Sequence, residues 1–148
     1  IKVYRDFYGV EGMYMCTPYH GIVELIKELR AGGKHIYVAT SKPELYTKQI
    51  IERKKMTDLF DFIGGADLAE QKRIEKIQVI NYVLEENNLV NKKDSCLMIG
   101  GRNYDINGAH AAGMKGCGVL WGFGSRKEFE DCGADFICEK PADVLRLV

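Results

Sequence analysis

The chain alternates short apolar runs with segments in which apolar residues recur at helical spacing. The short runs predict strands, and they cover residues 35–39, 60–63, 96–99, 118–121 and 133–137. The segments between them predict helices over residues 22–31, 43–51, 73–86 and 105–113, from residue 125 onward, and at the C-terminus. The run at 96–99 is apolar at every position, which is typical of a strand that is buried on both faces. This alternation predicts an α/β fold with a parallel sheet flanked by helices.

The first 18 residues do not follow this alternation. They are rich in aromatic residues, and Val3, Phe7 and Val10 fall at helical spacing with no capping residue before them. That spacing predicts the end of a helix. Tyr19-His20-Gly21 then predicts a linker, so we divide the chain into residues 1–18 and a core domain over residues 19–148.

Charge and cysteine usage exclude several classes of protein. The 21 Lys and Arg residues balance the 21 Asp and Glu residues, so no overall field attracts a nucleic acid polymer or an anionic membrane. No apolar run approaches the roughly 20 residues that span a bilayer. Five cysteines without Cys-x-x-Cys spacing favour buried free thiols in a reducing cytoplasm over a metal-binding or catalytic cysteine.

Two of the predicted strands end in residues that indicate a ligand site. The strand at 35–39 is followed by Thr40-Ser41-Lys42-Pro43-Glu44, in which Ser41 and Glu44 have the spacing of a capping box. Strand-end hydroxyl groups and free helix N–H groups together form an anion site, although a well-capped helix without any ligand has the same pattern. The strand at 96–99 ends at Gly100-Gly101 and precedes a helix with Asp105 in its first turn. Parallel sheets bind ligands at such carboxyl ends.

The chain resembles the haloacid dehalogenase-like (HAD) phosphatases, in the phosphoglycolate phosphatase or 5′-nucleotidase-like branch. The positions similar to the family's last motif are Ile99-Gly100, Arg102, Asp105, Gly108-Ala109, Ala112-Gly113, Gly118-Val119 and Gly122-Phe123-Gly124-Ser125. Thr40 to Glu44 and the pair Arg73 and Lys76 resemble two further family motifs. Gly101 departs from the pattern, because the family has an acidic residue there.

The resemblance implies a Rossmann-like core that hydrolyses a small phosphorylated metabolite with Mg²⁺, of the phosphoglycolate or 5′-nucleotide type. Thr40 and Ser41 would bind the phosphate. Lys76 would be the catalytic lysine that offsets phosphate charge, with Lys72 as the nearest alternative. Asp105 would hold the metal or its water. This metal site would be weakened because Gly101 stands where the family has an acidic residue. Residues 1–18 would be the remnant of a helical cap.

The family's nucleophile motif, Asp-x-Asp, has no counterpart in the sequence, because no aspartate has a second aspartate two positions on. The family places that strand at the centre of the sheet, between the strands that end at Thr40 and Ile99. Because unpaired buried backbone groups cost about 1–3 kcal/mol each, we expect an upstream segment or a partner strand to fill this place. The chain alone is expected to be inactive. The alternative is a non-catalytic module that binds a phospho-ligand or a partner.

Overall fold

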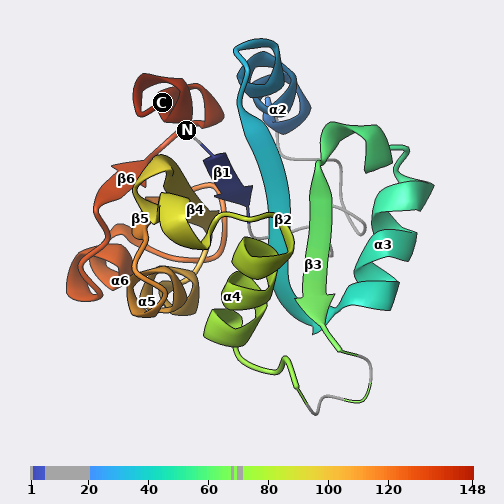
Figure 1. Cartoon of the computed structure of the whole chain (residues 1–148). Coiled ribbons are helices and arrows are strands. Elements are labelled where there is room, and N and C mark those ends of the chain that lie inside the picture. Colours follow the sequence, from blue (N-terminus) through green and yellow to red (C-terminus); the bar gives the residue numbers. More distant parts are fainter. Residues whose placement is uncertain (1, 6–20, 68, 70–71) are drawn as a thin grey trace.

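The structure is a computed structural model that describes residues 2–5, 21–67, 69 and 72–148 (Figure 1). The described strands form one parallel sheet in the order β3-β2-β1-β4-β5-β6. Their bounds are β1 Lys2–Arg5, β2 His35–Pro43, β3 Phe62–Ala66, β4 Cys96–Gly100, β5 Lys115–Val119 and β6 Phe136–Cys138. The predicted α/β parallel sheet is confirmed, with β3 at an edge.

Helices cover both faces of the sheet. They are α2 Ile22–Ala31, α3 Glu44–Arg53, α4 Lys76–Glu86, α5 Asn103–Ala111 and α6 Arg126–Asp131, with 3₁₀ helices η1 Thr57–Leu59, η2 Val90–Ser95 and η3 Pro141–Arg146. In β2, Ile36 and Val38 pack in the core with α2, α3 and η3, while Tyr37 and Ala39 pack in the core with α4 and α5. Burial on both faces explains why the strand is apolar along its length. No helix in the described part of the chain has the length and apolar character needed to cross a membrane.

The centre of the sheet differs from the sequence prediction. Residues Lys2–Arg5, predicted as part of a helix end, form β1, which pairs in parallel with β2 and β4 (Figure 1). Val3 lies opposite Ile36 on one side and Leu97 on the other. The helix prediction was wrong here because two ladders of strand hydrogen bonds outweigh a weak helical spacing. Residues 6–20 lie outside the described residues, so the cap remnant and the domain boundary remain predictions.

Several element bounds also differ from those predicted. The strand β2 continues to Pro43, so α3 begins at Glu44 without the predicted capping box. The helix α4 begins at Lys76 rather than Arg73, because the Gln78 side chain accepts hydrogen bonds from two preceding backbone N–H groups. The strand β5 covers 115–119 rather than 118–121, since its pairing with β4 sets its register. Ser125 caps α6 as predicted, accepting a hydrogen bond from the N–H of Glu128.

Candidate functional site

The predicted site residues converge at the carboxyl edge of the sheet. Successive strands run outward from β1 through β2 to β3 on one side, and from β4 through β5 to β6 on the other. The order therefore reverses between β1 and β4, which is where open parallel sheets bind their ligands. Thr40 lies on β2, Lys76 is the first residue of α4, and Asp105 is in the first turn of α5.

Lys76 and Asp105 form a buried ion pair. The Lys76 Nζ lies 2.8 Å from Asp105 Oδ1, and the two side chains are 4% and 0% exposed. The same ammonium group donates a hydrogen bond of 3.2 Å to the carbonyl oxygen of Ala39, next to Thr40. Asp105 Oδ2 accepts a hydrogen bond of 3.1 Å from the backbone N–H of Arg102. The pair thus connects β2, α4 and α5 around the predicted phosphate position.

Two glycines make room for this pair. A Cβ atom on Gly100 would lie 2.3 Å from the Cβ of Asp105, and one on Gly108 would lie 2.7 Å from the Cγ of Lys76. Such distances are too short for real Cβ contacts, so a side chain at either position would displace the pair. A Cβ atom on Gly101 would have Gly122 Cα at 3.5 Å and Phe123 N at 3.7 Å as its nearest contacts, so this position has room for a Cβ atom.

Thr40 and Ser41 directly follow Ala39, whose carbonyl oxygen accepts the hydrogen bond from Lys76. Thr40 is fully buried, and its Oγ1 accepts a hydrogen bond of 3.2 Å from the backbone N–H of Lys42. Ser41 is partly exposed. Lys72, the alternative to Lys76, is exposed on the loop before α4, where its backbone N–H donates to Asp67. The geometry therefore brings Lys76, rather than Lys72, next to Asp105 and the end of β2.

The side chains present do not make up a magnesium site by themselves. Among the described residues, no group of three or more His, Cys, Asp or Glu side chains is arranged to hold a metal ion. Asp105 directs one oxygen to Lys76 and the other to the N–H of Arg102, and Gly101 has no side chain. Mg²⁺ requires near-octahedral oxygen ligands. The Mg²⁺ prediction therefore depends on ligands from outside the described residues.

Two supporting interactions were not predicted from the sequence. Glu128 of α6 accepts hydrogen bonds from Arg102 Nε at 3.0 Å and from the N–H of Asn103 at 2.8 Å, which holds the start of α5. Arg73 donates to the carbonyl oxygen of Gly65 at 2.9 Å, and its guanidinium group lies 3.9 Å from the centre of the Tyr82 ring. The Glu128 contacts join residues 25 and 26 positions apart, which no local pattern reveals. The match of Arg73 to a family motif was the one available signal.

Three of the four described cysteines are buried in strands, as predicted, and Cys132 is free and partly exposed. Cys96, Cys117 and Cys138 are free and buried in β4, β5 and β6. A hydrogen bond with Cys138, whose Sγ is 3.4 Å away, and burial together raise the pKa of Cys117. The same hydrogen bond lowers the pKa of Cys138. A thiol that stays protonated, as at Cys117, is a poor nucleophile and metal ligand.

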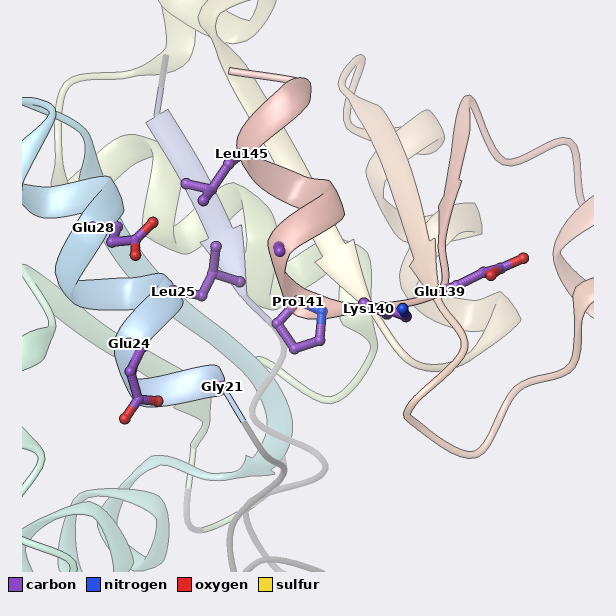
Figure 2. A pocket seen from close by; sticks show the side chains of 9 residues that line it. Gly21, Glu24, Leu25, Glu28, Glu139, Lys140, Pro141 and Leu145 are labelled. Atoms are coloured by element: carbon purple, nitrogen blue, oxygen red, sulfur yellow. The ribbon is translucent and has the colours of Figure 1, made fainter.

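A separate hollow of about 450 Å³ lies between α2 and η3 (Figure 2). Leu25, Pro141 and Leu145 give it an apolar lining, and Glu24 and Glu28 are also among its lining residues. None of the predicted site residues lines it. The hollow is therefore distinct from the site at the ends of β2 and β4.

The fold and the site together define a Rossmann-like α/β protein with a lysine and aspartate pair at the point where the strand order reverses. Residues 1–119 match the family model of the haloacid dehalogenase-like hydrolases. The chain belongs to this family of hydrolases.

Its relatives carry several functional names. It is 36% identical over 128 residues to a 5′-nucleotidase from Pseudomonas aeruginosa, covering 86% of this chain and 57% of that protein. It is 33% identical over 131 residues (88% and 44%) to the tyrosine-protein kinase PtkA of Mycobacterium tuberculosis, and 24% identical over 147 residues (99% and 63%) to a phosphoglycolate phosphatase of Vibrio parahaemolyticus.

The chain is also similar in sequence and in fold to a solved structure. The crystal structure of a predicted phosphatase from Clostridium acetobutylicum superposes with a TM-score of 0.82 at 38% identity, covering 87% of this chain and 58% of that one. The chain thus spans less than two thirds of the length of each of these relatives.

Proposed function

We propose that this chain is the phosphate-binding core of a phosphatase that hydrolyses a small phosphorylated metabolite of the phosphoglycolate or 5′-nucleotide type. The observation that carries the proposal is the position of Lys76 Nζ, which contacts both Asp105 and the carbonyl oxygen of Ala39 beside Thr40. The names of the nucleotidase and phosphoglycolate phosphatase relatives support the substrate class.

Each residue has a defined task in this proposal. Thr40 and the backbone of Ser41 bind the phosphate oxygens, and Lys76 offsets their charge as the transferred group gains it. Asp105 orients the ammonium group of Lys76. Turnover additionally needs a nucleophilic aspartate and Mg²⁺, for which the described residues provide neither the nucleophile motif nor a complete ligand set.

The second candidate is a non-catalytic module that binds a phosphorylated ligand. Gly101 favours it, since the position where the family has an acidic residue lacks any side chain.

One experiment separates the two candidates. A longer form of the protein that carries an upstream Asp-x-Asp strand is assayed for phosphate release from phosphoglycolate and 5′-mononucleotides, with Mg²⁺ and with either Gly101 or Gly101→Asp. In this form the upstream strand would take the central place that Lys2–Arg5 hold in the 148-residue chain. The enzyme proposal expects turnover with Gly101→Asp, which Thr40→Val then removes. If Gly101→Asp gives no turnover although phosphate still binds, the non-catalytic module is the correct function.

A further inference from the structure

We propose that this site binds a phosphate group without a divalent cation. The inference rests on the proposed function, since it needs the anion site at Thr40 and Lys76. It concerns the binding step alone, which does not involve the family's nucleophile.

The charges around the site carry the argument. A phosphate site with several carboxylates needs a metal cation, because carboxylate and phosphate oxygens repel one another. Here the described site contains the carboxylate of Asp105, and the ammonium group of Lys76 neutralises it at 2.8 Å. The nearby carboxylate of Glu128 is paired with Arg102 at 3.0 Å. Each of these two described carboxylates therefore already has a cationic partner when a phosphate enters.

The surroundings of Gly101 also favour phosphate binding without a divalent cation. Apart from its chain neighbours, the only described atoms within 4 Å of a Cβ at this position are Gly122 Cα and Phe123 N. Neither a carbon atom nor a backbone nitrogen is a ligand for Mg²⁺, which takes oxygen ligands. The position that would supply a further carboxylate thus contributes no negative charge and no metal ligand.

The test is a titration of the 148-residue chain with inorganic phosphate, followed by the amide NMR signals of Ser41 and Lys42. It is run in EDTA and in MgCl₂ at equal ionic strength. We expect the Kd in the two buffers to agree within about twofold, because the carboxylates of Asp105 and Glu128 in the described part of the site already have cationic partners. Gly101→Asp adds one negative charge in a position that has room for a Cβ atom, and Gly101→Asn is its neutral control of the same size. We expect Gly101→Asp to weaken binding in EDTA about tenfold, with recovery in MgCl₂, and Gly101→Asn to bind like the natural chain.

Each outcome decides a separate point. Binding by the natural chain that needs MgCl₂ overturns the inference and leaves the proposed function standing. Equal weakening by Gly101→Asp and Gly101→Asn also overturns it, since size rather than charge then controls binding. If phosphate binds in neither buffer, the anion site itself is absent and the proposed function fails.

Discussion

Lys76 and Asp105 stabilise the protein only as a pair, because each is a buried charge that the other neutralises. Lys76→Met leaves the Asp105 carboxylate buried without its cation. We expect a loss of about 3–5 kcal/mol in the free energy of unfolding, measured by urea denaturation.

The double variant Lys76→Met with Asp105→Asn removes both charges and is expected to regain part of that loss. Lys72→Met, at an exposed site, should change stability by less than about 0.5 kcal/mol. Additive effects of the two single substitutions would contradict a coupled pair.

Gly108 provides a second prediction for a single residue. Alanine normally stabilises a helix interior relative to glycine by about 0.5–1 kcal/mol. Here the added Cβ would lie 2.7 Å from Lys76 Cγ and 3.2 Å from Ile80 Cδ1. We therefore expect Gly108→Ala to lower the melting temperature and to weaken phosphate binding. Asn107→Ala on the exposed side of the same helix is the control and should raise the melting temperature slightly. Stabilisation by Gly108→Ala would show that the Lys76 side chain is not held at this position.

Family motifs in the sequence pointed to Thr40, Lys76 and Asp105. The structure brings Lys76 to Asp105 and to the carbonyl oxygen next to Thr40, and the roles of the three residues stay predictions. The sequence did not distinguish Lys76 from Lys72 on physical grounds, because helical spacing alone does not tell which lysine is buried. It also missed Glu128 as a partner of Arg102, since that contact depends on the packing of α6 beside α5.

Between elements, Arg73 holds the loop before α4 to the end of β3. Its Nε donates to the carbonyl oxygen of Gly65, whose N–H donates to Glu44 at the start of α3. We expect Arg73→Lys to lower stability by about 1 kcal/mol, because an ammonium group cannot both stack on Tyr82 and reach Gly65 in the same way. The Gly65 amide should also exchange faster with solvent hydrogen. The exposed Lys72→Ala is the control, and equal exchange at Gly65 in both variants would refute the role of Arg73.

Asp135 connects α5 to the start of β5 and makes stability depend on pH. Burial works to raise the pKa of Asp135, but the hydrogen bonds from the N–H of Gly116 and from His110, both 2.8 Å, outweigh it and lower the pKa below 3.8. A lowered pKa in the folded state gives stability that is present above the unfolded value and is lost as the pH falls through the folded value. We expect Asp135→Asn to reduce the urea midpoint at pH 5.

The same comparison at low pH checks the sign. Because the natural Asp135 is itself protonated in strong acid, the difference between the two proteins should shrink as the pH falls through the lowered pKa of Asp135. Asp131→Asn is a control on an exposed pair with Lys127 and should change little at either pH. A difference that stays constant from pH 5 to strong acid would mean that the charge of Asp135 contributes nothing.

The elements themselves were predicted better than their ends. Apolar runs identified β2 and β4 because both strands are buried on two faces. The end of β2 was placed too early. Residues 40–43 are polar apart from a proline, so no apolar pattern indicates that this segment pairs with β3. Likewise, the spacing of Ser41 and Glu44 suggested a capping box, whereas the Glu44 side chain accepts a hydrogen bond from the N–H of Gly65.

At the scale of the whole molecule, the sheet was predicted to need a strand between β2 and β4, but not to obtain it from residues 2–5. The need for a central strand follows from backbone hydrogen bonding, which applies to any sequence. Which residues form that strand does not follow from it, and four residues are too few for a reliable strand pattern. The fold class was thus predictable from repeated apolar runs over many residues, while the identity of its central strand was not.

The role of β1 leads to a prediction for the whole sheet. A strand with neighbours on both sides has its amides in ladders that open only when the sheet opens. We expect the amides of Val3, Tyr4 and Arg5 to exchange as slowly as those of their partners Val38 and Ile99, measured by hydrogen exchange with NMR detection. Tyr4→Pro removes an N–H from this central strand and should speed exchange at Val38 and Ile99 together, because β1 joins the two halves of the sheet that the described strands form. If residues 3–5 exchange at the rate of an unfolded peptide while Val38 and Ile99 stay protected, another segment occupies the centre, as the upstream-strand prediction requires.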